Sequence, residues 1–87
     1  MGARKLNNKY ANVISKNLSK YRNLRGLSQP DICRELSLLG INMYINDIYR
    51  IEHNKKSVKD FELYAFAKVL KVSVLDLLDG VDKKFDY

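Results

Sequence analysis

The sequence predicts one compact all-α domain of five helices. Its 87 residues suffice for a single domain with a modest core, and 46% of them are hydrophobic, which argues against disorder throughout. Glycine and proline number only four and one, so few turns are available for a sheet of many strands. Apolar residues instead recur at steps of three and four, as in helices that bury one face.

The first helix is predicted over about residues 8–25. Its buried face would carry the apolar residues at helical spacing, which are Tyr10, Val13, Ile14, Leu18, Tyr21 and Leu24. Its other face carries Lys9, Lys16 and Lys20, and Gly26 follows as a C-terminal stop.

The second helix begins at SQPD, residues 28–31. Ser28 can cap it, Pro30 is tolerated in a first turn, and Asp31 lies three residues on, near the positive end of the helix. Gly40 closes it, and residues 41–44 form a connector. Its inward-facing residues are expected to be Ile32, Cys33, Leu36 and Leu39.

The third helix is predicted from about Ile45 to His53, with Asn54 as a left-handed terminator. The segment INMYINDIYRIEHNKK, residues 41–56, places Ile48 and Ile51 three apart on a buried face. Residues able to form hydrogen bonds surround them, and two lysines follow. The result is a short helix with an apolar back, a polar front and a basic end.

The fourth helix begins within SVKD, residues 57–60, and SVLD, residues 73–76, starts a short fifth helix. The fourth should bury Leu63, Phe66, Ala67 and Leu70, and Leu75 and Leu78 should dock the fifth, which Gly80 ends. We expect residues 1–7 to be a flexible N-terminus, residues 8–80 to form the domain, and residues 81–87 to be a frayed C-terminal tail.

The net charge of +6 is spread unevenly along the chain. Residues 1–34 carry +7, residues 35–59 carry +1 and residues 60–87 carry −2. The basic portion should attract an anion, nucleic acid or anionic lipid above all, although a solvated surface rich in lysine would give the same composition.

Other features narrow the class of protein. One cysteine, Cys33, excludes a disulfide framework and fits a reducing compartment, and no apolar run approaches the roughly 20 residues needed to span a bilayer. The first ten residues show no secretory signal, and Leu6 departs from a myristoylation signal. We therefore expect a cytoplasmic protein that does not bind membranes.

Three motifs in order resemble the Xre-like helix–turn–helix family, the fold of lambda-type repressors. They are LSQPDICREL, INDIYRIEHNKK and ELYAFAKVLKVSVLDLL, and the resemblance covers about residues 10–79. It implies a five-helix lambda-repressor-like domain that binds DNA through its third helix. The chain departs from the family by about five extra residues in SLLGINMY, by Pro30, and by Asn54 where glycine is common.

The third helix concentrates the candidate DNA contacts. The resemblance puts Ile45, Asn46 and Arg50 at base-contacting positions, and Tyr44 and Tyr49 within reach of bases or phosphates. Arginine can bond guanine, asparagine can bond adenine, and an apolar side chain can touch a thymine methyl. Asp47 would be repelled by phosphates unless it accepts a hydrogen bond from a cytosine amine or caps the helix, and we expect capping or local ordering. The alternative for the whole face is ordinary solvation.

Phosphate contacts should come from the flanks of that helix. Ser28 and Gln29 lie at a helix N-terminus, where N–H groups and the dipole attract anions, and Lys55, Lys56 and Lys59 follow the third helix. The resemblance also implies an ion pair of Arg22 with Glu52, which would set orientation more than stability.

The main hypothesis is a sequence-specific double-stranded DNA-binding protein, a transcriptional repressor or regulator that acts as a homodimer on a palindromic operator. The acidic C-terminal end, with Val72, Val74 and Leu77 partly available, is the expected dimer contact. The alternatives are a protein-interaction module of the same fold, of the antitoxin or anti-repressor type, and membrane-surface binding by the first helix.

We expect neither an enzyme nor a cofactor. The sequence has no phosphate-binding glycine loop, no nucleophile–base pair and no set of metal ligands, since His53 stands alone. Cys33 is expected to fill a small core gap, and Asp76 with Asp79 to form a solvated face.

Overall fold

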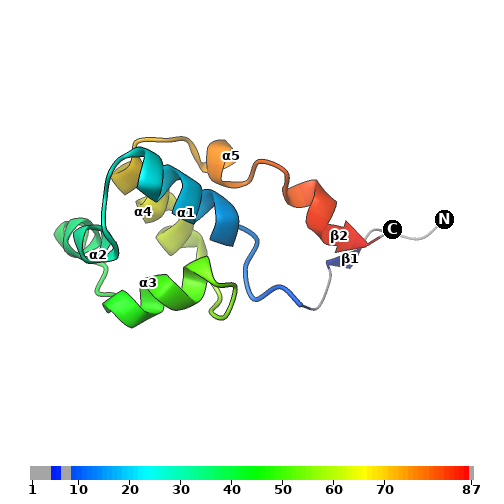
Figure 1. Cartoon of the computed structure of the whole chain (residues 1–87), viewed down its shortest axis with the longest axis horizontal. Coiled ribbons are helices and arrows are strands. Elements are labelled where there is room, and N and C mark those ends of the chain that lie inside the picture. Colours follow the sequence, from blue (N-terminus) through cyan, green and yellow to red (C-terminus); the bar gives the residue numbers. More distant parts are fainter. Residues whose placement is uncertain (1–4, 7–8, 87) are drawn as a thin grey trace.

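The structure, a computed structural model, describes residues 5–6 and 9–86 and contains five α-helices (Figure 1). They are α1 (Ser15–Leu24), α2 (Gln29–Leu38), α3 (Ile45–Glu52), α4 (Asp60–Leu70) and α5 (Val74–Leu77). The predicted all-helical domain of five helices is therefore confirmed. Two further features were not predicted: a 3-10 turn, η1 (Val81–Lys84), and an antiparallel pair of two-residue strands, β1 (Lys5–Leu6) and β2 (Phe85–Asp86).

A single apolar core joins the five helices. α2 packs against α3 and α4, while α1 packs against α3, α4 and α5. The buried apolar residues are Ile14, Leu18, Ile32, Leu36, Ile48, Ile51, Ala65, Phe66, Ala67, Leu70 and Leu77. Most occupy the positions that the three- and four-residue spacing assigned to the inside.

Local side-chain bonds begin the helices where the sequence predicts. The Ser28 hydroxyl accepts the N–H of Asp31 at 3.1 Å, and the Asp31 carboxylate accepts the N–H of Ser28 at 2.8 Å. Ser73 and Asp76 form the same reciprocal cap on α5. Asn54 ends α3 with φ +58°, the left-handed conformation expected of a terminator.

The start of the first helix was predicted wrongly. α1 begins at Ser15, about seven residues later than expected, because the backbone before it is bonded to the end of α3. The N–H groups of Ala11 and Asn12 donate to Asn54 Oδ1 at 2.8 and 3.1 Å. Asn12 Nδ2 donates to the carbonyls of Ile51 and Lys56, both at 2.9 Å. These bonds replace the helical ones that the apolar spacing suggested.

The docking of α5 was predicted only in part, since Leu78 packs against the core and Leu75 does not. Leu77 is fully buried, whereas Leu75 is 78% exposed and Leu78 is half-buried. Val72 and Val74 pack partly buried against the core. Helix α5 has only four residues, and from the predicted cap at Ser73 it turns Leu77, rather than Leu75, toward the core. Leu77 is thus removed from the predicted dimer surface.

The two ends of the described chain lie together at one end of the long axis, away from the helices (Figure 1). In the backbone register of the two strands, Lys5 lies opposite Asp86 and Leu6 lies opposite Phe85. The C-terminal tail, which was expected to fray, forms η1 and then β2, which pairs with β1. Of the N-terminus predicted to be flexible, residues 1–4 and 7, like Tyr87 in the tail, lie outside the described residues.

Candidate nucleic-acid interface

α3 separates its apolar and polar side chains onto opposite faces. Ile48 and Ile51 are fully buried in the core. Asn46, Tyr49 and Arg50 are exposed on the other side. Steps of three and four residues repeat on one helix face and steps of one and two do not, so this division follows from the spacing. The outward edge of α3 thus offers an amide, a phenol and a guanidinium to solvent.

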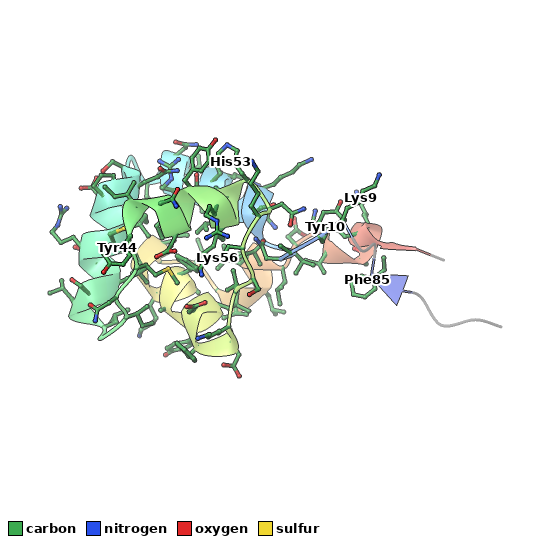
Figure 2. The ribbon with its side chains drawn as sticks, turned by 90° about the horizontal axis from the view of Figure 1, so that it is seen from below. Lys9, Tyr10, Tyr44, His53, Lys56 and Phe85 are labelled. Atoms are coloured by element: carbon green, nitrogen blue, oxygen red, sulfur yellow. The ribbon has the colours of Figure 1, made fainter. Side chains whose placement is uncertain are left out.

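The N-terminal end of α3 is held by a carboxylate cap. Asp47 Oδ2 accepts the N–H of Tyr44 at 2.9 Å, which confirms the predicted capping role of Asp47. Lys56 Nζ lies 3.9 Å from Asp47 Oδ1, so the charge of this carboxylate is partly offset. Tyr44 is 82% exposed and Ile45 is 50% exposed. Tyr44 and His53 mark the two ends of the helix in Figure 2, with Lys56 beside its middle.

The C-terminal end of α3 carries a stacked pair of rings. Tyr49 and His53 lie with centroids 3.9 Å apart and an interplanar angle of 23°. His53 Nδ1 lies 2.8 Å from the Tyr49 carbonyl oxygen, which holds the imidazole along the helix. The stack covers one face of the phenol ring, and the Tyr49 side chain remains 45% exposed.

The structure brings Arg22 and Glu52 together beneath this helix. Arg22 Nε donates to Glu52 Oε2 at 2.6 Å, and Nη2 donates to Oε1 at 3.0 Å, a bidentate pair. The two side chains are 14% and 3% exposed. The hydrogen bond to Glu52 raises the pKa of Arg22 above its ordinary value. Arg22 Nη1 also donates to the Leu27 carbonyl, so this pair ties α1 and the start of α2 to the end of α3.

The predicted phosphate-contacting residues differ in their surroundings. Gln29 Nε2 donates to Glu52 Oε1 at 3.1 Å, so its amide is engaged within the protein. The Ser28 amide is likewise bonded to the Asp31 carboxylate. Lys55 is exposed and Lys56 is half-buried. The ammonium of Lys59 lies 5.8 Å from the centroid of the Phe61 ring, so it lies beside α4.

Asn54, just after α3, and Asn12, in the segment before α1, were not predicted to act together. Asn54 Nδ2 donates to the Lys9 carbonyl at 3.0 Å, in addition to the bonds that its Oδ1 accepts from the segment before α1. Asn12 is buried and links the same segment to the Ile51 carbonyl. These partners are about 40 residues apart, so no local spacing could have revealed them.

A hollow on α4 was also missed. It encloses about 310 Å³ and is lined by Leu39, Ile41, Phe61, Tyr64, Ala65 and Lys68. Phe61 and Tyr64 are more than half exposed. Its only sequence signal was the apolar SLLGINMY segment, which forms the end of α2 and the six-residue connector to α3.

No three His, Cys, Asp or Glu side chains of the described residues gather as metal ligands, and none of the described helices has the length and apolar content to cross a bilayer. Cys33 packs half-buried against the core, as expected, and burial raises the pKa of its thiol.

Comparisons with protein-family models, curated proteins and solved structures find no match to this chain. The class of site therefore rests on geometry. The fold and the site define a five-helix domain that presents one polar helix edge to solvent, with lysines immediately beyond it.

Proposed function

We propose that the chain is a sequence-specific double-stranded DNA-binding protein with a lambda-repressor-type helix–turn–helix fold. In this proposal α2 and α3 form the motif, α3 enters the major groove, and the protein acts as a dimeric transcriptional repressor or regulator on a palindromic operator. The observation that carries it is the division of α3, with Ile48 and Ile51 fully buried and Asn46, Tyr49 and Arg50 exposed opposite them.

The exposed groups of α3 match the chemistry of base edges. A guanidinium at Arg50 can donate two hydrogen bonds to guanine, and the Asn46 amide can both donate to and accept from adenine. Ile45, half-exposed at the start of the helix, suits a thymine methyl. The Arg22–Glu52 pair and the Asn54 bonds fix the far end of α3, which favours a rigid edge over an adaptable one.

The flanking charges suit the DNA backbone. Lys55 and Lys56 follow α3 directly, and Lys56 lies beside the middle of that helix in Figure 2. Lysine is a point charge that binds phosphate without reading sequence, so these residues would hold the position of α3 in the groove. The connector from α2 to α3 has six residues, residues 39–44, and is longer than the three- or four-residue turn usual in helix–turn–helix motifs.

The experiment is a selection of bound sequences from a random duplex pool, followed by affinity measurements at several salt concentrations. We expect one enriched motif with two-fold symmetry, and log K falling by roughly 0.9 per phosphate neutralised as log salt rises. A matched variant, Lys16→Ala, removes an exposed charge of α1 and should leave the motif unchanged. Failure to enrich any sequence or to bind any duplex at low salt would reject the proposal.

The second candidate is a protein-interaction module, and the apolar hollow on α4 favours it. Leu38 and Leu39 extend this exposed apolar surface on the neighbouring end of α2. The two candidates differ in duplex binding: a DNA-binding protein retains salt-sensitive affinity even for random duplexes, whereas a pure interaction module has none.

A further inference from the structure

The outer face of α4 has a charge pattern that is complementary to itself. Asp60, Tyr64 and Lys68 are spaced by four residues, so they form one stripe along the helix, and all three are exposed. The stripe has an acid at its start, an aromatic ring at its centre and a base at its end. A two-fold axis through the centre exchanges the two ends.

We propose that α4 pairs antiparallel with α4 of a second copy of this chain, about a two-fold axis that passes through Tyr64. In that arrangement Asp60 lies opposite Lys68 of the second copy, and Lys68 lies opposite its Asp60. Two ion pairs therefore flank a central contact of the two Tyr64 rings, and no like charges of the stripe meet.

The surroundings of the stripe supply apolar area. Phe61 and Tyr64 are 55% and 58% exposed, and with Leu39 and Ile41 they border the hollow of about 310 Å³. Lys68 Nζ lies 5.8 Å from the Tyr64 ring centroid, so the base and the ring already lie on the same part of the surface. An exposed apolar surface with charged ends is typical of an interface with a polar rim.

The position of this face leaves α3 accessible. α4 packs against α1, α2 and α5. In Figure 2, which views the molecule from the α3 side, α4 lies beside α3 and does not cover it. Two copies joined through α4 would therefore leave both α3 edges exposed, as binding to two half-sites requires.

The α4 face is the surface through which the proposed dimer would form. Only the role of this dimer on DNA rests on the proposed function. The face is small, so we expect a weak dimer that occupancy of two adjacent half-sites strengthens through effective concentration. It replaces the C-terminal contact around Leu77, which the core buries.

The test is sedimentation velocity of the full chain without DNA, over a concentration series, for the parent and two charge reversals. Asp60→Lys leaves two bases on the stripe and Lys68→Glu leaves two acids. Each variant alone opposes like charges twice, so we expect its dimer dissociation constant to rise about tenfold or more. An equimolar mixture restores both opposite pairs, and we expect it to form a heterodimer with the parent's affinity.

The mixture is the control for misfolding, because two variants that had unfolded would not form a heterodimer. Tyr64→Arg places two like charges on the axis without altering the start of α4, and should also break the dimer. Lys16→Glu reverses an exposed charge on α1 and should leave the dimer intact.

A parent chain that stays monomeric at every concentration overturns the inference, as do single variants that dimerise like the parent or a mixture that stays monomeric. The two proposals fail separately. A chain that stays monomeric but binds a selected duplex retains sequence-specific DNA binding without this dimer, and a dimer that follows the charge rules but binds no duplex retains this inference alone.

Discussion

α3 and α4 are both amphipathic helices with one buried face, yet their exposed faces differ in kind. α3 presents Asn46, Tyr49 and Arg50, and lysines follow its C-terminal end. α4 presents two aromatic rings, Phe61 and Tyr64, beside an apolar hollow. The buried faces use the same chemistry, isoleucine and phenylalanine in one shared core.

The difference teaches that periodicity assigns a helix to the core and says little about its task. A polar edge with hydrogen-bonding ends suits base edges, whereas exposed rings between opposite charges suit another protein surface. The two helices also differ in how they are held. α3 is tied at its C-terminal end by side-chain bonds to distant residues, and α4 is held mainly by burial.

The largest expected effect comes from removing the tie at the end of α3. Glu52→Ala leaves three donors without their acceptor, two on Arg22 and one on Gln29. We expect the free energy of unfolding in urea to fall by about 3 kcal/mol, because the guanidinium is left unpaired and mostly buried. DNA affinity should fall with it. Glu35→Ala, on the half-buried side of α2, is the matched control and should change stability by less than about 0.5 kcal/mol. Unchanged unfolding of Glu52→Ala would mean that the pair does not hold α3.

The next effect separates the two exposed faces. Arg50→Ala should weaken binding to the selected duplex by about 2 kcal/mol and relax the preference at one base pair, both measured by fluorescence anisotropy. The free energy of unfolding should not change. Tyr64→Ala, on α4, should leave affinity for a duplex with a single half-site unchanged. Equal weakening on all sequences by Arg50→Ala would instead assign the guanidinium to a phosphate.

Much of the fold could be predicted because its signals are local. The reciprocal bonds of Ser28 with Asp31 need only three residues of sequence, and the left-handed turn at Asn54 follows from its residue type. The start of α1 could not be predicted, since the bonds of Asn12 to Ile51 and Lys56 span about 40 residues. The apolar spacing from Tyr10 to Leu18 fits a helix and equally fits a segment packed on the core.

The candidate site divides in the same way. The exposure of Asn46, Tyr49 and Arg50 follows from burying Ile48 and Ile51. The hydrogen bond from Gln29 to Glu52 cannot be predicted from the sequence around either residue, because it depends on how α2 packs against α3. The helical spacing of Phe61 and Tyr64 fits the core and an interface equally, so the sequence does not decide which of the two the α4 face forms.

A smaller effect tests the basic end of α3. Lys55→Ala should weaken binding to all duplexes alike and lower the slope of log K against log salt by about 0.9. Lys56→Ala should lower it less, because Asp47 lies 3.9 Å from that ammonium and offsets part of its charge. The measurement is anisotropy with one duplex over a salt series. Identical slopes for the two variants and the parent would place both lysines off the DNA backbone.

The smallest effect falls on α2, which packs against both helices of the comparison. Hydrogen bonds from the Ser28 amide and from Arg34 lower the pKa of Asp31 from 3.8 to about 2. Between these values the unfolded chain binds a proton that the folded chain does not, so stability rises with pH there. The contribution is fully present above about pH 4 and is lost as the pH falls toward 2. Asp31→Asn removes the titrating group, and we expect a shallower fall of urea stability over that range, with Arg34→Gln intermediate. Equal slopes for the parent and Asp31→Asn would show that the cap of α2 does not depend on this charge.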